Sequence, residues 1–264
     1  MFFAGVDIGS AFTKAVVLGD QGPVAYSIIP SGGDYAAAAR KAVAQALGEA
    51  GLAAETLRAA VATGMGAPKA PWAQVVVSDI TCQGWGVHHL FPEVRTIIDI
   101  GGQATKVVKV DGEGRALDFV INEKCAAGSG RFLQVIARVL RLDFQDLGPL
   151  SLQARNPVEF STGCAVFAES EAISRIAEGA RKEDLLAGVH QALAAKVFSL
   201  VQRVGLEKEI ALTGGGAKDT GLVKSLEEQL KLKLWVPPEP QITAALGAAL
   251  LARGAEHGGR PAGE

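Results

Sequence analysis

The sequence predicts an α/β fold built from two similar halves, and three observations agree on this. The segment Asp7–Lys14 (Asp-Ile-Gly-Ser-Ala-Phe-Thr-Lys) recurs 92 residues later as Asp99–Lys106 (Asp-Ile-Gly-Gly-Gln-Ala-Thr-Lys). Each copy follows an apolar strand and contains a tight glycine turn, so each is expected to open a three-strand unit. Helical patterns follow both units, and strands mixed with helices at this spacing are typical of α/β proteins.

The elements of the first half follow from local signals. Asp34 is a suitable helix N-cap residue, and it precedes an alanine-rich helix expected over 35–50, which a glycine ends. The apolar run at 59–63 predicts a buried strand, and 81–90 predicts a helix that stops before a proline.

In the second half, apolar residues at helical spacing predict a helix over 131–140. Longer helices are expected at 165–180 and 183–204, and a buried strand at 210–213 runs into the glycine cluster Gly214–Gly216. The remaining elements expected are a helix over 219–230, a strand over 232–236 and an alanine-rich helix from about Thr243.

Length and composition are those of a globular protein. The chain has 264 residues, of which 48% are hydrophobic and 20% charged. At about 150 residues per domain, one large or two small domains are expected. We expect halves at 1–94 and 95–264, with the final helix packing back towards the first half. The second half would then carry the cysteines discussed below.

Charge and hydropathy restrict the partners. The net charge is −2, and a nucleic-acid binder usually shows a basic excess. No apolar run reaches the ~20 residues that span a bilayer, and the N-terminus lacks the cationic leader of a signal peptide. The odd number of cysteines argues against a disulfide framework. We therefore expect a cytoplasmic protein without a nucleic-acid or membrane partner.

The two glycine turns predict phosphate binding. In such a turn, successive backbone N–H groups can approach an anion closely, and one turn from each half could grip a polyphosphate across a cleft. Asp7 and Asp99 end their strands just before the turns, and carboxylates suit Mg²⁺, directly or through water. A single hairpin glycine would be no more than a tight turn, but the repeat with its acid favours a function.

The turn residues expected to bind ATP are Gly9, Ser10, Ala11, Lys14, Gly101, Gly102 and Gln103, with Lys106 as the counterpart of Lys14. Asp7, Asp99 and Gln103 are the candidate catalytic residues, the glutamine as a group that positions water or phosphate. The lysines could instead be solvated residues on a strand.

The glycine cluster Gly214–Gly216 follows a buried strand and precedes a helix, which is where α/β folds bind ligands. A flat adenosine could lie on a backbone without side chains, and a flexible loop is the alternative. The order of hairpin, second hairpin and glycine cluster resembles the actin, Hsp70 and sugar-kinase superfold of ATPases. That resemblance implies two duplicated ribonuclease-H-like halves around a nucleotide cleft.

Two cysteines each lie just before a predicted helix. Cys125 is in Lys-Cys-Ala-Ala-Gly-Ser-Gly-Arg-Phe-Leu, and Cys164 begins Cys-Ala-Val-Phe-Ala-Glu-Ser-Glu. A helix N-terminus favours thiolate, the form that binds iron. An all-cysteine [4Fe–4S] cluster needs four thiolates, which two chains could supply in pairs. A small buried thiol is the alternative, and we expect that role for Cys82.

Both cysteine segments are similar to the BadF/BadG/BcrA/BcrD family of ATPases, in particular to the activators (component A) of 2-hydroxyacyl-CoA dehydratases. The resemblance implies a homodimer that holds one [4Fe–4S] cluster between its subunits, bound by Cys125 and Cys164 of each. It also implies that ATP hydrolysis drives one-electron transfer at very low potential. The acceptor would be an iron–sulfur dehydratase or reductase, and the donor ferredoxin or flavodoxin.

Two positions depart from the family pattern. Ala104 stands where the family usually has Asp after Gly-Gly-Gln, and Ala11 stands where Thr is more frequent. Metal coordination and hydrolysis rate are therefore open. The four histidines show no metal-ligand spacing and are expected to be structural or solvated.

Several alternatives remain from the sequence. One is an ATPase subunit of a benzoyl-CoA-reductase-type complex, in which the chain would pair with a related subunit. Another is a sugar or acyl kinase of the same superfold, with Asp99 as base, although a kinase has no use for the two cysteine segments. The third is a non-enzymatic actin-like or chaperone-like ATP switch, for which the chain lacks a large substrate domain.

Overall fold

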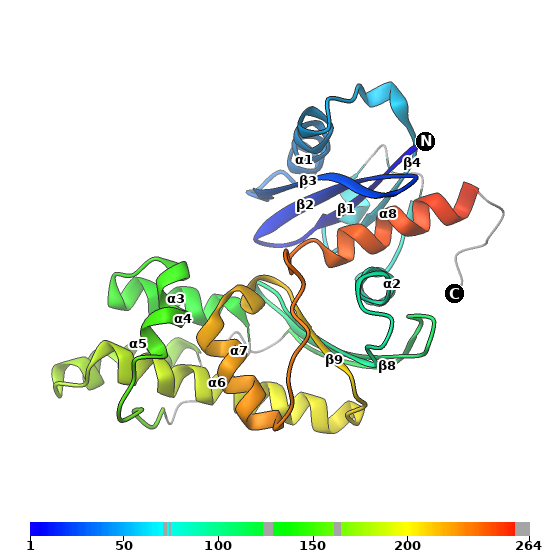
Figure 1. Ribbon diagram of the computed structural model, residues 1–264. Coiled ribbons are helices and arrows are strands. Elements are labelled where there is room, and N and C mark those ends of the chain that lie inside the picture. Colours follow the sequence, from blue (N-terminus) through cyan, green and yellow to red (C-terminus); the bar gives the residue numbers. More distant parts are fainter. Residues whose placement is uncertain (71–72, 74, 124–128, 161–164, 257–264) are drawn as a thin grey trace. The chain divides into compact units, whose positions relative to one another are not determined.

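The computed structural model describes residues 1–70, 73, 75–123, 129–160 and 165–256 (Figure 1). The chain divides into two compact units. Unit 1 comprises Met1–Arg95, Val110–Asp118 and Gln241–Glu264, and unit 2 comprises Thr96–Lys109 and Phe119–Pro240. The second unit is thus inserted into the first, because the chain returns to unit 1 for its last helix.

Unit 1 contains a five-stranded mixed sheet of order β3-β2-β1-β4-β5. Its strands are β1 (Phe2–Ile8), β2 (Phe12–Gly19), β3 (Gly22–Pro30), β4 (Leu57–Thr63) and β5 (Val75–Val76). The first three form an antiparallel meander, and β4 runs parallel to β1. The predicted glycine turn is the connection between β1 and β2.

Helices cover both faces of this sheet (Figure 1). On one face lies α1 (Tyr35–Glu49), whose first turn is capped by the Asp34 carboxylate accepting from the Ala37 N–H at 3.0 Å. On the other face lies α8 (Thr243–Glu256), which packs against α2 (Asp79–Leu90). Strand alternation therefore supplies two apolar layers, one under α1 and one under α8. Short 3₁₀ turns, η1 (Ala54–Thr56) and η2 (Ala67–Lys69), flank β4.

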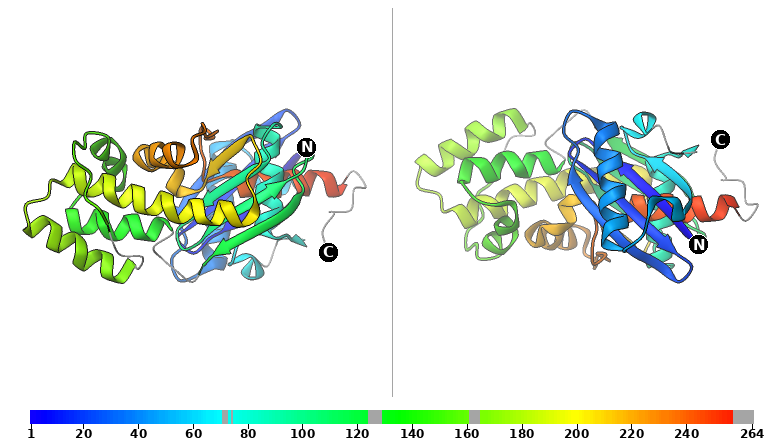
Figure 2. Two further views of the ribbon diagram at one scale, coloured as in Figure 1. Left: turned by 90° about the horizontal axis from the view of Figure 1, so that it is seen from below. Right: turned by 90° about the horizontal axis from the view of Figure 1, so that it is seen from above.

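Unit 2 is built on a four-stranded sheet of order β8-β7-β6-β9. Its strands are β6 (Thr96–Ile100), β7 (Thr105–Val110), β8 (Ala116–Asn122) and β9 (Ile210–Thr213), and the 3₁₀ turn η4 (Gly215–Lys218) follows β9. The helices are α3 (Gly130–Leu140), α4 (Phe144–Ser151), α5 (Ala165–Ala177), α6 (Lys182–Val204) and α7 (Thr220–Leu230). They bury one face of the sheet, and α3 and α5 run alongside each other (Figure 2).

The observed elements confirm the predicted α/β class and correct two details. Helix α4 was not expected, because its Gly-Pro pair reads as a loop. The strand expected over 232–236 is wrong: only Trp235 forms a bridge, with Ala211. The N–H of Trp235 donates to Ile210 and its carbonyl accepts from Leu212, both at 2.9 Å. Two prolines follow within three residues and cannot donate to a ladder, so the pairing ends there.

Helix α6 is long and apolar enough to cross a membrane by length and composition alone. In the structure, 56% of its apolar stretch is buried inside the protein, as is usual for the core helix of a globular unit.

Candidate functional site

In the first glycine turn, two backbone N–H groups have no hydrogen-bond acceptor in the described chain. The Gly9 N–H closes the turn by donating to the Phe12 carbonyl at 3.1 Å, and the Gly9 carbonyl accepts from Ser31 Oγ at 2.6 Å. Among the described residues, the backbone N–H groups of Ser10 and Ala11 have no acceptor. Adjacent unpaired N–H groups in a tight turn form a concave site for an anion.

The second glycine turn repeats this geometry. The Gly101 N–H donates to the Ala104 carbonyl at 2.9 Å, and the N–H groups of Gly102 and Gln103 again lack an acceptor within the described chain. One contact has no counterpart among the described residues of unit 1. The carbonyls of Gly101 and Gly102 accept from the first N–H groups of α3, those of Gly130 and Arg131, at 2.9 Å each. The turn in unit 2 is therefore hydrogen-bonded directly to the start of a helix.

Each turn is preceded by a carboxylate with a lysine opposite it. Asp7 pairs with Lys14 across the β1–β2 ladder, and Asp99 pairs with Lys106 across β6–β7. Lys14 Nζ lies 2.7 Å from Asp7 Oδ2, whereas Lys106 Nζ lies 3.8 Å from Asp99 Oδ2. All four side chains are at most 19% exposed, so the carboxylates are sheltered but accessible to a cation.

The structure reveals a second repeat that the sequence analysis missed. Thr63 pairs with Asp7 on the parallel neighbour strand, as Thr213 pairs with Asp99. Both threonines precede Gly-x-Gly-Ala, namely Gly64–Ala67 and Gly214–Ala217. The signal was present in the sequence, but the copies are 150 residues apart and a search at the hairpin spacing of 92 passes over it.

The first glycine of each copy lies in the left-handed region and touches the carboxylate. Gly64 has φ +85° and Gly214 has φ +80°. A Cβ added at Gly64 would lie 2.5 Å from Asp7 Oδ1, and one at Gly214 would lie 2.6 Å from Asp99 Oδ1. Only glycine therefore fits between the strand end and the acid.

The glycine cluster of unit 2 is fixed at both ends. The Gly214 N–H donates to the Pro240 carbonyl at 2.8 Å. At the other end, the Asp219 carboxylate caps α7 by accepting from the N–H groups of Gly221 and Leu222 at 3.0 and 3.1 Å. Gly214 and Gly215 remain partly exposed, so a ligand can reach the backbone between these two anchors.

The cysteines separate into two kinds. Cys125 and Cys164 lie outside the described residues, and the described helices α3 and α5 begin at Gly130 and Ala165. Cys82 is completely buried on α2. Burial, which disfavours the thiolate, raises the pKa of Cys82 to about 12, with the charges of Asp7 and Asp79 adding to the shift and a hydrogen bond with Thr63 opposing it. Among the described residues, no three His, Cys, Asp or Glu side chains gather as metal ligands would.

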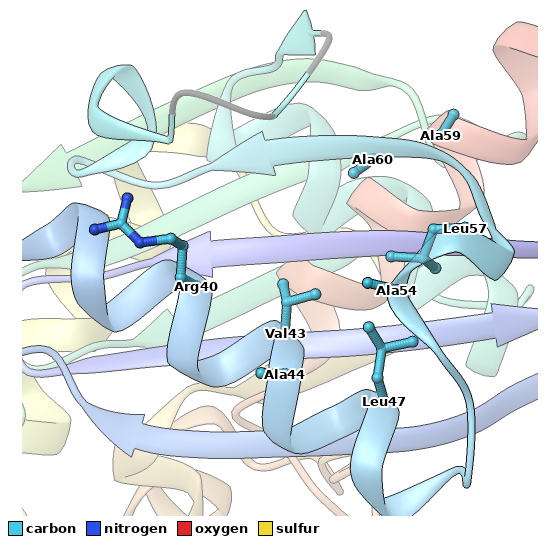
Figure 3. Close-up of a pocket in the computed structure, with 8 residues that line it drawn as sticks. All are labelled: Arg40, Val43, Ala44, Leu47, Ala54, Leu57, Ala59 and Ala60. Carbon is cyan, nitrogen blue, oxygen red and sulfur yellow. The ribbon is translucent and has the colours of Figure 1, made fainter.

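A groove of about 300 Å³ opens between α1 and the β4 strand of unit 1 (Figure 3). It is lined by Arg40, Val43, Ala44, Leu47, Ala54, Leu57, Ala59 and Ala60. Arg40 is the one charged residue of this lining, and none of the predicted site residues contributes to it. The predicted site residues that the structure describes thus lie at strand ends within each unit and not in this groove.

Known proteins are similar to this chain over nearly its whole length. It is 41% identical over 252 residues to the 2-hydroxyisocaproyl-CoA dehydratase activator of Clostridioides difficile, which covers 96% of this chain and 95% of that protein. It is 40% identical over 252 residues to the activator of lactoyl-CoA dehydratase of Anaerotignum propionicum, with coverages of 96% and 97%.

Solved structures agree. The activator of the 2-hydroxyisocaproyl-CoA dehydratase from Clostridium difficile, with bound ADPNP, superposes with a TM-score of 0.93 at 39% identity and covers 100% of both chains. A ROK family glucokinase from Streptomyces griseus, at 14% identity, a TM-score of 0.56 and coverages of 96% and 99%, shares the fold. The predicted actin/Hsp70/sugar-kinase-like fold is confirmed. The family match extends over residues 4–252, and the chain belongs to the BadF/BadG/BcrA/BcrD ATPase family.

Proposed function

We propose that this chain is an ATP-dependent reductive activator, a homodimer with one [4Fe–4S] cluster that couples ATP hydrolysis to one-electron transfer at very low potential. The acceptor would be a partner enzyme such as a 2-hydroxyacyl-CoA dehydratase. The observation that carries the proposal is the 41% identity to a dehydratase activator over 96% of the chain. The geometry of the two turns supports its ATPase part.

Phosphate binding is assigned to the glycine turns. The unpaired N–H groups of Ser10 and Ala11, and those of Gly102 and Gln103, suit phosphate oxygens. Lys14 and Lys106 lie beside the acids and add positive charge. Asp7 and Asp99 are the proposed Mg²⁺ ligands, directly or through water, and the exposed Gln103 side chain can orient a water molecule. The backbone of Gly214–Gly216 is the proposed adenosine contact.

The thiol chemistry of this chain fits a cluster shared by two copies. Cys82 is not proposed as a ligand, because its side chain is completely buried in the apolar layer under α8 of unit 1. Each chain then offers two thiols, Cys125 and Cys164, and four thiolates require two chains. Bound in this way, the cluster would supply one-electron redox chemistry.

In unit 2, the proposed phosphate turn is hydrogen-bonded to the start of α3, the helix that follows Cys125 in the sequence. The carbonyls of Gly101 and Gly102 hold the N–H groups of Gly130 and Arg131, at the start of α3. Cys125 lies five residues before Gly130 in the sequence. A change in the turn on binding or losing a phosphate would therefore be transmitted to this helix start through two hydrogen bonds.

Exposed apolar side chains on α5 support pairing with a second copy. Phe167, Ile173 and Ile176 are 63%, 54% and 37% exposed, on the helix that directly follows Cys164. Ile173 and Ile176 are three residues apart and so share one face of the helix, and exposed apolar residues on one face are typical of surfaces that another protein covers.

Partner and donor follow from the same proposal. The dehydratase component is the proposed electron acceptor, and ferredoxin or flavodoxin the proposed donor, in the cytoplasm. A subunit of a benzoyl-CoA-reductase-type complex is the second candidate, and it differs in pairing with a related subunit. Purification of the chain expressed alone distinguishes the two, because a homodimer with a full cluster requires no second polypeptide.

The test is iron and sulfide analysis of protein purified without air. About four iron atoms per dimer are expected in the wild type and in Cys82→Ala, and none in Cys125→Ala or Cys164→Ala. All variants should still bind an ATP analogue, because the proposed phosphate turns do not involve these thiols. Iron retained in both Cys125→Ala and Cys164→Ala, or lost on replacing Cys82 in a folded protein, contradicts the ligand assignment.

A further inference from the structure

Three polar side chains meet in the interior of unit 2, where α4, α6 and α7 converge. Ser151 is 6% exposed, His190 0% and Asp219 2%. His190 Nδ1 lies 3.0 Å from Ser151 Oγ, and His190 Nε2 lies 2.9 Å from Asp219 Oδ2. The sequence predicts His190 to be structural or solvated, because it is isolated and shows no metal-ligand spacing; its two partners lie 39 and 29 residues away.

The order Ser–His–Asp is that of a nucleophilic triad, but the surroundings exclude hydrolysis. Ser151 Oγ donates to the Gly148 carbonyl at 2.8 Å, one helical turn back. A Cβ at Gly221 would collide with both Ser151 Oγ and the His190 ring, so α7 packs directly against a hydroxyl that is itself buried. The three side chains therefore form a structural connection, and the question is what this connection holds.

Asp219 is the member that reaches the glycine cluster. It follows η4 directly, and its own N–H donates to the Gly216 carbonyl at 3.1 Å. Its Oδ1 is used by the N–H groups of Gly221 and Leu222, while Oδ2 faces His190. An ionised carboxylate only accepts, so the proton of this last contact belongs to His190 Nε2.

We propose that His190 is a positioning residue for nucleotide binding: by donating to Asp219, it fixes the C-terminal anchor of the glycine cluster Gly214–Gly216. This inference rests on the proposed role of that cluster in holding adenosine. Ser151 orients the far side of the ring and contributes to stability, but it does not reach the anchor. Loss of the donor to Asp219 should loosen the cluster and weaken ATP binding while leaving the chemical step unchanged.

Two substitutions separate the contacts of His190. The amide of a glutamine reaches the position of the imidazole Nε2, so His190→Gln keeps a donor for Asp219. The shorter asparagine reaches the position of Nδ1, so His190→Asn keeps the contact with Ser151 and loses the one with Asp219. Ser151→Ala is the matched control, because it removes the opposite contact from the same ring.

The first readout is amide hydrogen exchange of Gly214–Lys218 in the full chain without nucleotide. Exchange should rise about tenfold in His190→Asn, because a hydrogen bond to a charged group corresponds to about that factor. Exchange should stay near wild type in His190→Gln and Ser151→Ala. Equal exchange in the Asn and Gln variants, or a rise in Ser151→Ala, overturns the inference and leaves only a packing role.

The second readout is steady-state ATPase activity. His190→Asn should raise KM for ATP about tenfold with kcat within about twofold, and His190→Gln should restore KM. A fall in kcat at unchanged KM contradicts the positioning role. If ATP does not protect Gly214–Lys218 from exchange in the wild type, the proposed adenosine contact fails, whereas the exchange pattern without nucleotide still tests the anchor.

Discussion

In both units a strand ends in an aspartate followed by a glycine turn, but the aspartate and the turn make different contacts in the two units. In unit 1, Lys14 contacts the Asp7 carboxylate at 2.7 Å, and the Gly9 carbonyl of the turn accepts from Ser31, the residue after β3. In unit 2, Lys106 is 3.8 Å from Asp99, and Thr213 Oγ1 donates to Asp99 Oδ1 at 3.2 Å. The turn of unit 2 holds the start of α3 instead of a neighbouring strand.

This difference indicates how the duplicated unit has diverged. Lys14 forms a close ion pair with Asp7, which compensates the negative charge beside the turn that we propose as an anion site. Asp99 has a more distant lysine and a neutral hydroxyl partner, and we infer that it is the carboxylate better placed to bind a metal ion. The turn of unit 2 is also the one connected to a cysteine-led helix. We infer that unit 1 chiefly anchors phosphate, with Asp7 as a secondary Mg²⁺ ligand, and that unit 2 supplies the principal Mg²⁺ ligand, Asp99, and transmits the response to α3.

The largest expected effect is on ATP hydrolysis. Asp99→Asn should lower kcat at least a hundredfold, because it removes the proposed principal Mg²⁺ ligand and a negative charge beside the phosphates. Asp7→Asn should lower kcat about tenfold, since its charge is already neutralised by Lys14. The check is steady-state ATPase activity over a range of Mg²⁺ concentrations. Equal losses in the two variants would mean that the carboxylates share the metal evenly and would refute the division of roles.

The next effect is on stability, and here the two units should behave alike. Gly64→Ala and Gly214→Ala each place a Cβ against a carboxylate and a backbone carbonyl at positive φ. Each should lower the free energy of unfolding by about 3 kcal/mol, measured by urea denaturation.

Gly32→Ala is the control for these two glycines. Gly32 also has positive φ, +59°, but nothing lies within 4 Å of an added Cβ. Gly32→Ala should therefore lower the free energy of unfolding by about 1 kcal/mol, which is the backbone strain alone. If Gly64→Ala and Gly214→Ala lower the free energy of unfolding no more than Gly32→Ala does, the close approach of these glycines to the acids does not affect stability.

A smaller effect should distinguish the two lysines. Lys14→Met removes a close, sheltered ion pair and should lower the free energy of unfolding by about 1 to 2 kcal/mol more than Lys106→Met. Methionine keeps the apolar stem, so the packing along each strand is preserved. Urea denaturation of both variants at low and high salt is the measurement. Identical losses would show that the difference between 2.7 and 3.8 Å has no consequence in solution.

The sequence was informative where function depends on short local patterns. The paired hairpins, the Asp34 cap and the helix starts before which Cys125 and Cys164 lie all follow from contiguous residues. The two cysteine segments resemble those of the 2-hydroxyacyl-CoA dehydratase activators, and the family that this resemblance predicts is confirmed.

What the sequence did not show depends on contacts between distant residues. His190 has no motif, because its partners come from two other helices and meet only after packing. The copy at Thr63-Gly64 is not visible at the hairpin spacing. Helices α3 to α6 are inserted between β8 and β9 of unit 2, so the two Thr-Gly copies are farther apart in the sequence than the two hairpins. The burial that raises the pKa of Cys82 likewise comes from packing, since α8 closes over α2 only after the chain returns from unit 2.

The smallest expected effect concerns the paired threonines, and it tests whether the acids are held differently. Thr213 Oγ1 donates to Asp99 Oδ1, so Thr213→Val should lower the free energy of unfolding by about 1 to 2 kcal/mol. Thr63 Oγ1 is buried, and the described chain offers it no hydrogen-bond partner apart from the weakly bonding Cys82 thiol. Thr63→Val should therefore be neutral or slightly stabilising, because it removes a buried polar atom that gains little from its surroundings.

Both threonines are completely buried and occupy the same register beside their acids, so packing differences between the two valine variants are small. Urea denaturation of the two variants in parallel compares their free energies of unfolding, and steady-state ATPase activity compares their kcat values. Thr213→Val should also reduce kcat, since Asp99 loses the hydroxyl that orients it, whereas Thr63→Val should leave kcat unchanged because Lys14 still holds Asp7. A larger loss of stability or of kcat in Thr63→Val than in Thr213→Val would reverse the assignment. Unit 2 would then be the unit that anchors phosphate.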